Sequence, residues 1–189
     1  MHDFVETFHR NDGHWMPYRS NVVHDAQNHR MLLIPNRTDG DYYCFTGTAK
    51  PGQAEDYGLF GDATGGAVSI DAGLASGSFS EDAGNLRIFI AYCPTGTQYL
   101  TLFSKPFVRA CDLTAEGTTI TVPLTPSQWP EAENTENFGF RVSKSFVFSH
   151  LNEFGVTHHK PWNGVDDGVF WFDNAAIAFL AQSQNGERL

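Results

Sequence analysis

Short β-prone runs separated by strong turn signals dominate this sequence, and they limit the chain to an all-β fold. Turns with glycine at the position that needs a positive backbone angle punctuate it, as in Asn-Asp-Gly at 11–13, Thr-Asp-Gly at 38–40 and Pro-Thr-Gly at 94–96. Many short strands joined in this way are typical of a two-sheet antiparallel β-sandwich. The predicted strands are residues 3–8, 30–34, 42–46, 66–71, 85–92, 98–103, 118–124, 138–143 and 169–179.

Length and composition agree with one such sandwich. The 189 residues suit a single domain over 1–189, because all-β sandwiches often reach about 200 residues. The chain has 16 Phe, 18 Gly and 9 Pro, a mixture that favours strands and tight turns over long helices. Residues 86–103 form the clearest hairpin, and Pro123 indicates an edge strand because proline cannot donate to a sheet ladder. A helical turn is predicted at 126–133, and 146–154 fits either a short strand or an irregular segment.

Charge and hydropathy exclude several partners. The formal net charge is −10, so the long-range field opposes binding to the phosphates of nucleic acid. No apolar run is long enough to insert into a membrane. The N-terminus lacks the basic and apolar regions of a signal peptide, so we expect a soluble chain that fits the mature form cut from a longer precursor. Three cysteines, Cys44, Cys93 and Cys111, allow at most one disulfide and do not have zinc-ligand spacing.

One carboxylate interrupts the last predicted strand. If residues 169–179 alternate between two faces, Asp173 shares its face with Trp171 and Ile177, on a side that is otherwise apolar. An unpaired buried carboxylate costs several kcal/mol, so such a residue usually binds a metal, a cation or backbone N–H groups. The acidic residues elsewhere, including Asp166 and Asp167, fit a solvated surface or sites for hard cations.

Aromatic residues in predicted loops suggest a sugar-binding site, because the apolar face of a pyranose stacks on flat rings. Trp162 is the first candidate, since His159 and Asn163 nearby can exchange hydrogen bonds with hydroxyls. Trp15 with Tyr18 is the second candidate. The alternative for either tryptophan is a structural ring that closes the end of the sandwich.

Catalysis has little support in the sequence. A nucleophile elbow, a phosphate-binding loop and a His-Glu-x-x-His motif are all missing from it. The eight histidines lack the spacing of ligand pairs and are expected to be solvated, with His158 and His159 on opposite faces if extended. A polysaccharide lyase or glycoside hydrolase stays an alternative, because sandwich enzymes scatter their catalytic groups; Arg87 and His150 are among the residues that could contribute.

The order of motifs resembles the galactose-binding-like jelly rolls, a superfamily that includes many carbohydrate-binding modules. The resemblance rests on Phe4-Val-Glu-Thr-Phe8, then Asp12-Gly-His-Trp15, and at the end Phe172-Asp-Asn174. The central Tyr42-Tyr-Cys-Phe45 and the segment 57–71 are also similar to laminin-B-type extracellular domains. The resemblance implies a jelly-roll sandwich whose first and last strands pair.

The resemblance also implies a structural calcium ion near that pairing, held by an acidic residue of the first strand and Asp173. By position the first-strand ligand is Glu6. The superfamily usually places this residue directly beside an aromatic, whereas Val5 separates Glu6 from Phe4, so Asp3 is an alternative ligand. Calcium prefers such oxygen ligands.

The sequence therefore predicts a non-catalytic, extracellular module that recognises a polysaccharide or other glycan. The alternative from a different class is a structural or adhesive subunit that self-associates and has no small ligand. A concentration-dependent oligomer would favour that alternative, and an aromatic-lined face on a monomer would favour the glycan.

Overall fold

A computed structural model describes residues 4–9, 15–18, 20–35, 42–48, 60–92, 100–130, 144–151, 153–160 and 166–180. Of residues 16–18, 20, 35, 42–48, 100, 153, 157, 159 and 160 within these ranges, it describes the backbone only. All structural statements below concern this part of the chain. The predicted strand at 138–143 lies outside it.

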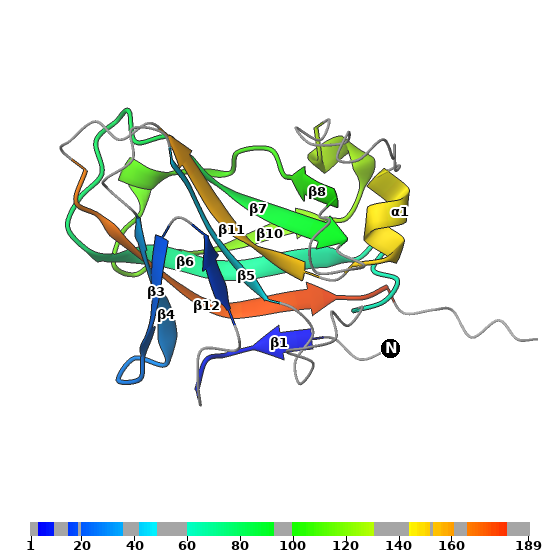
Figure 1. Ribbon diagram of the computed structural model, residues 1–189, viewed down its shortest axis with the longest axis horizontal. Helices are drawn as coiled ribbons and strands as arrows, with labels where there is room; N and C mark the ends of the chain where they lie inside the picture. Colours follow the sequence, from blue (N-terminus) through cyan, green and yellow to red (C-terminus); the bar gives the residue numbers. More distant parts are fainter. Residues whose placement is uncertain are drawn as a thin grey trace, which may run out of the picture.

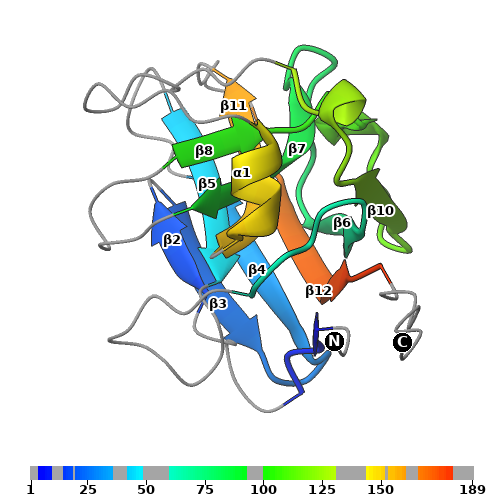
Figure 2. The same cartoon turned by 90° about the vertical axis from the view of Figure 1, so that its right-hand side faces the viewer.

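Two antiparallel sheets form the molecule and pack face to face (Figures 1 and 2). Sheet A has the order β10-β6-β12-β4-β3, with β1 added beside β12, and sheet B has the order β2-β5-β11-β7-β8, with β9 added beside β7. The strands of sheet A are β1 (Phe4–Glu6), β3 (Ser20–Asp25), β4 (Arg30–Pro35), β6 (Ala67–Ser76), β10 (Thr118–Pro123) and β12 (Val169–Ala178). The strands of sheet B are β2 (Met16–Tyr18), β5 (Tyr42–Thr48), β7 (Asn85–Tyr92), β8 (Leu100–Phe103), β9 (Val108–Arg109) and β11 (Glu153–Lys160). This confirms the predicted two-sheet β-sandwich.

The core lies between the sheets and is built by alternation along the strands. In β7 the inward residues Leu86, Ile88 and Ile90 are at most 1% exposed, and Val68 and Ile70 fill the same role in β6. Each such side chain contributes about 1.5–3 kcal/mol through burial. Helical structure in the described part is limited to η1 (Ala110–Asp112), η2 (Pro126–Gln128) and α1 (Lys144–Ser149), and α1 covers one end of the sandwich beside β7 and β8 (Figure 2).

Several predicted relationships are confirmed. The first and last described strands pair, with Phe4 opposite Ile177. The hairpin at 86–103 forms as β7–β8, with Phe89 opposite Phe103. Pro123 lies on β10, which is an edge strand of sheet A.

Other assignments are corrected. Strands β2, β3, β9 and β11 were not predicted, and the helical turn at 126–133 is only the short η2. The ambiguous segment at 146–154 divides into the end of α1 and the start of β11. No helix in the described ranges is both long and apolar enough to cross a membrane.

The predicted face of Asp173 is wrong because a β-bulge reverses the alternation of β12. Asp173 lies opposite Asp71 and Ala176 lies opposite Ser69, so β12 has one residue more than β6 over this stretch. The extra residue of the bulge is Asn174, whose backbone lies in the left-handed region with φ of 49°. Phe172 and Ile177 consequently face the core, whereas Asp173 faces outward.

Candidate functional site

The outer face of sheet B, the side turned away from the core, is the first candidate site. Its positions alternate with the core residues Leu86, Ile88 and Ile90 of β7. Strand register places these positions in rows that cross the sheet. One row is Tyr18, Phe45, Thr157 and Arg87, and the next is Met16, Gly47, Gly155, Phe89 and Phe103.

Aromatic residues concentrate in these two rows. Phe89 is only 3% exposed although it lies outside the core cluster, and the facing Phe103 is half-buried. The chain neighbours of Phe103 are buried, Leu102 on β8 and Ser104 directly after it, which fixes Phe103 on the outer side. Phe89 is therefore covered, whereas Phe103 keeps part of its ring exposed, and an exposed ring is a surface on which a sugar can pack.

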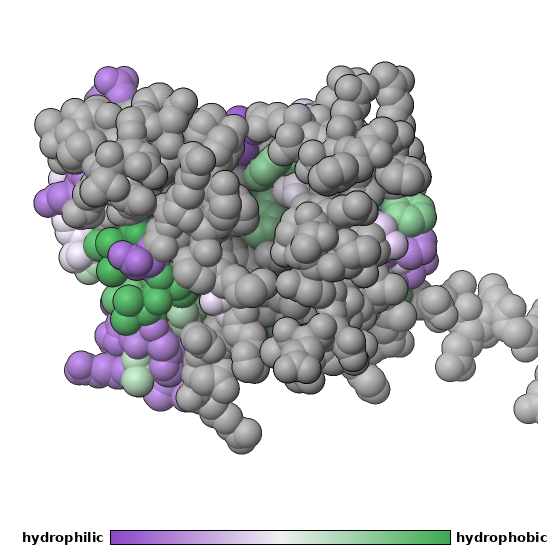
Figure 3. Space-filling view, viewed as in Figure 1, coloured by the Kyte–Doolittle hydropathy of each residue, from purple (hydrophilic) through white to green (hydrophobic). Residues whose placement is uncertain are grey.

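Two facing glycines occupy the middle of the aromatic rows. Gly47 of β5 lies directly opposite Gly155 of β11, and Gly155 lies opposite Phe89 of β7. Neither glycine has a side chain, so this point of the face is built by backbone alone, and Gly155 is buried. Figure 3 views the molecule from the sheet B side and shows hydrophobic described atoms near the middle of this face, between atoms drawn in grey.

Polar positions flank the aromatic ones. Arg87 is half-buried, and it makes no hydrogen bond, ion pair or ring contact with another described residue. His159, on β11, lies one row beyond Thr157 and opposite Tyr43. Donors beside rings can bind the hydroxyls of a sugar that packs on the rings.

The residues predicted from sequence to bind sugar have different outcomes in the structure. Tyr18 and His159 are brought to the same face of sheet B, in adjacent rows. Trp162 and Asn163 lie outside the described residues, so their predicted roles stay predictions. Trp15 is a correction: it is only 4% exposed, and its ring packs edge-on against Phe8 and Phe154 in the core.

Sequence reasoning did not select Arg87, Phe89 or Phe103 as ligand-binding residues. The available signal was the nearly continuous apolar run that follows Arg87 in β7, Ile-Phe-Ile-Ala. Such a run is typical of a strand covered on both faces, and not on the core face alone.

A second polar cluster surrounds Asp173 on the outer face of sheet A. Asp173 Oδ1 accepts a hydrogen bond of 2.7 Å from the backbone N–H of Asn174. Asp71, on the adjacent strand, accepts from Asn174 Nδ2 at 2.7 Å and from Thr119 Oγ1 at 2.5 Å. Burial and, to a smaller extent, the charge of Asp71 raise the pKa of the Asp173 carboxyl, against the effect of the Asn174 hydrogen bond and of His9 and His29.

The described residues do not fit the calcium site that the resemblance implies. Glu6 lies opposite Ala175, a core-facing position, and its Oε1 accepts from the backbone N–H of Phe8 at 2.8 Å. Asp173 faces the other side of the sheet, so Glu6 and Asp173 do not converge on one ion. Within the described ranges, no three His, Cys, Asp or Glu side chains are grouped to hold a metal, and Asp3 lies outside those ranges.

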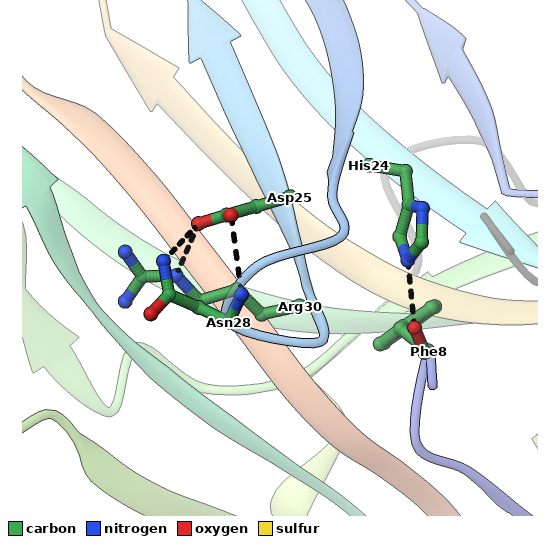
Figure 4. A network of polar contacts seen from close by, with 5 residues as sticks. All are labelled: Phe8, His24, Asp25, Asn28 and Arg30. Carbon is green, nitrogen blue, oxygen red and sulfur yellow. Dashed lines mark hydrogen bonds and ion pairs between the residues drawn. The ribbon is translucent and has the colours of Figure 1, made fainter. Parts of the chain in front are cut away.

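The β3–β4 hairpin holds an arginine above the outer face of sheet A (Figure 4). Arg30 Nε is 3.0 Å from Asp25 Oδ2, and Asn28 Nδ2 donates to the same oxygen at 2.8 Å. The Asn28 hydrogen bond and the Arg30 guanidinium lower the pKa of Asp25. The guanidinium lies 5.5 Å from the ring centre of Trp171, whose indole is seated on Gly73 and Gly117, so this tryptophan is covered on both sides.

Two further predictions need correction. His158 is fully buried in β11, and its Nε2 contacts the carbonyl oxygen of Ala83, so it is not a solvated loop histidine. Asp166 is 6% exposed and accepts a 2.7 Å hydrogen bond from the backbone N–H of Ser80, so it is a buried anchor and not a surface charge. Cys111 is a free, partly exposed thiol, and the state of the other two cysteines lies outside the described side chains.

The chain has the jelly-roll β-sandwich fold that carbohydrate-binding modules share. No protein-family model matches the sequence, and no curated protein has significant sequence similarity to it. The similarity to known proteins is therefore one of fold.

Three solved structures illustrate that similarity. A family 11 carbohydrate-binding module from Clostridium thermocellum, in complex with a β-1,3-1,4-mixed-linked tetrasaccharide, has a TM-score of 0.57 at 15% identity, over 94% of this chain and 95% of that one. The N-terminal modules of a C. thermocellum endo-1,4-β-D-xylanase, in complex with xylohexaose, have a TM-score of 0.53 at 12% identity, over 95% of this chain and 28% of that one. An exo-β-agarase has a TM-score of 0.53 at 8% identity, over 96% of this chain and 26% of that one.

Proposed function

We propose that this protein binds a polysaccharide or other glycan without cleaving it, through the outer face of sheet B. The observation that carries the proposal is the pair of rows on that face: the aromatic positions Tyr18 and Phe45 precede the polar positions Thr157 and Arg87 in one row, and Phe89 and Phe103 follow two glycines in the next. Flat apolar positions beside hydrogen-bond donors match the two kinds of surface that a sugar offers.

The comparisons support the same function. A carbohydrate-binding module with this fold is in complex with a mixed-linked tetrasaccharide, and a xylanase of which this chain matches 28% is in complex with xylohexaose. Identities of 12–15% leave the ligand of the present chain open to experiment, so the proposal names the class of ligand and not the sugar.

The experiment is binding of the purified chain to arrayed glycans and to immobilised polysaccharides, followed by the Phe103→Ala variant. Loss of a half-buried ring from the contact should weaken binding at least about tenfold, because burying a phenylalanine contributes roughly 1.5–3 kcal/mol. Val23→Ala is the control because Val23 is 46% exposed and lies on the outer face of sheet A, opposite Leu32 of β4 and turned away from sheet B.

Thermal unfolding of both variants shows whether the fold is kept. A folded protein that binds none of the arrayed glycans contradicts the proposal and favours the structural or self-associating class. Binding that is unaffected by Phe103→Ala places the site elsewhere on the molecule.

An extracellular location and a structural calcium ion are separate proposals. The first follows from the use of carbohydrate-binding modules on polysaccharides outside cells, and it is tested by locating the protein in culture fractions. The second is carried over from the resemblance alone, because Glu6 and Asp173 face opposite sides of sheet A. A melting temperature that EDTA lowers in the wild type but not in Asp173→Ala would support calcium, and an unchanged melting temperature would contradict it.

A further inference from the structure

Arg87 lies on the candidate face and has no ion-pair partner among the described residues. It belongs to β7, which lies between β11 on one side and β8 and β9 on the other. Its side chain is half-buried, so part of its hydration has been lost on folding. Removing a charge from water without a partner is unfavourable, which makes such a group a strong site for an anion.

The other described cations are engaged or solvated. Arg30 pairs with Asp25, Arg109 lies 4.0 Å from Asp112, and Lys144 Nζ contacts the carbonyl oxygen of Trp129. Lys105 is exposed. Among the described lysine and arginine side chains, Arg87 is therefore the one that is half-buried and has no described partner. This is notable because the chain has 22 acidic residues and only 12 lysines and arginines.

No described carboxylate on this face is close enough to neutralise Arg87. Glu153 lies opposite Ala91, four residues along β7 from Arg87. At roughly 3.3 Å per residue this separates the two positions by about 13 Å along the strand, more than the screening length of about 8 Å at physiological salt.

The spacing between Arg87 and the rings suits one sugar unit. Arg87 and Phe89 are two residues apart on the same face of β7, about 7 Å along the strand, and Phe103 lies opposite Phe89. A pyranose that packs against Phe103 can therefore direct a ring substituent toward Arg87. The guanidinium presents a planar fork of donors that matches the paired oxygens of a carboxylate or a sulfate.

From this juxtaposition, and resting on the proposed function, we infer that the outer face of sheet B recognises an anionic glycan and that Arg87 binds the carboxylate or sulfate group of one sugar unit. Charge-assisted hydrogen bonds are about twice as strong as neutral ones, so an anion gains more at Arg87 than a hydroxyl does. Nonspecific attraction does not account for such binding, because the net charge of −10 repels a polyanion at long range.

The experiment compares matched ligands by calorimetry on the full chain. Polygalacturonate is paired with its fully methyl-esterified form, and κ-carrageenan with its desulfated form, so that each pair differs only in the anionic group. We expect the anionic member of at least one pair to bind ten to a hundred times more tightly, the range that one charged hydrogen-bonded contact supplies. The pair that shows the preference distinguishes carboxylate from sulfate.

Variants locate the effect. Arg87→Gln should remove the preference: it should weaken binding of the anionic member about ten- to a hundredfold and binding of the neutral member much less, because Gln can still donate to a hydroxyl. Arg87→Lys keeps the charge but loses the planar pair of donors and should retain only part of the preference. Arg109→Gln is the control, because Arg109 is an exposed arginine at the margin of the same sheet that already contacts Asp112. Melting temperatures confirm that each variant is folded.

The outcomes separate this inference from the proposed function. Equal binding of anionic and neutral members, or equal loss of both in Arg87→Gln, overturns the inference while carbohydrate binding stands. The absence of binding to any of the four polysaccharides, together with a blank glycan array, overturns both. The wild-type comparison decides the ligand class even where an Arg87 variant does not fold.

Discussion

Asp173 of β12 lies directly opposite Asp71 of β6, so two carboxylates face each other on the outer side of sheet A. Asn174, at the bulge, donates its backbone N–H to Asp173 and its side-chain amide to Asp71. The bulge and the hydrogen bonds of Asn174 hold this pair in place although the two charges repel.

The first prediction concerns the pH dependence of stability. Burial and Asp71 raise the folded-state pKa of Asp173 above its ordinary value of 3.8. The folded state therefore binds a proton more strongly than the unfolded state between these two pKa values, and the free energy of unfolding rises as the pH falls through that window. Asp173→Asn should stabilise the protein at neutral pH by about 0.5–1 kcal/mol and have no effect below the ordinary pKa.

Urea unfolding at neutral and acid pH measures this difference. Asp82→Asn is the control because Asp82 is exposed in the turn before β7. A loss of stability in Asp173→Asn at neutral pH would show that the ionised carboxylate is favourable, through His9, His29 or a bound cation.

A second prediction concerns the packing of the Trp171 indole against Gly73. An added Cβ at Gly73 would come closer to Trp171 Cε2 and Nε1 than real Cβ atoms do, and the indole lies under Arg30. Gly73 has no positive φ, so its substitution tests packing alone. Gly73→Ala should lower the free energy of unfolding by about 1–3 kcal/mol and alter the near-ultraviolet dichroism of tryptophan.

Thr121→Ala, at an exposed position of the neighbouring β10, is the matched control for Gly73→Ala. Unchanged stability in Gly73→Ala would mean that the indole moves away at little cost. In that case Trp171 would be free to leave its place under Arg30.

The fold was largely predictable because strand periodicity and turn residues are local properties of a sequence. The bulge was not predictable in the same way, since one extra residue at Asn174 reverses the alternation and moves Asp173 from the expected inner face to the outer one. Strand β11 was missed because Gly155 and two histidines weaken its local preference, and its pairing with β5 on one side and β7 on the other determines its structure.

The candidate site was harder to predict than the fold because it is assembled across strands. Arg87 becomes notable only when β11 and β5 place Thr157 and Phe45 in the same row. Tyr18 and His159 were selected from sequence as polar or aromatic residues near loops, and register alone brings them to one face. Trp15 was misassigned because a tryptophan after a turn gives no local signal that Phe8 and Phe154 enclose it.

A third prediction concerns the buried carboxylate of Asp166. This side chain accepts the backbone N–H of Ser80 and so fixes the segment after β6 against the start of β12. Asp166→Ala leaves a backbone donor without its acceptor and should lower the free energy of unfolding by about 1–3 kcal/mol. The adjacent Asp167→Ala should cost less, because Asp167 is exposed and water can replace its 2.7 Å bond from the N–H of Ser78. Equal losses in the two variants, measured by urea unfolding, would contradict the role given to burial.

The last prediction concerns Trp129, which joins three parts of the sandwich at one end. Its ring is fully buried, its Nε1 donates to the carbonyl oxygen of Pro123 at 2.9 Å, and its own carbonyl oxygen contacts Lys144 Nζ of α1. Trp129→Phe keeps an aromatic ring but removes the donor and part of the volume, so we expect a loss of about 2 kcal/mol. In a chain of this length that corresponds to a fall in melting temperature of roughly 4–8 °C. Lys144→Met isolates the second contact and should cost less than Trp129→Phe, since it removes no core volume. A larger loss in Lys144→Met would show that the link to α1, and not the buried indole, stabilises this end.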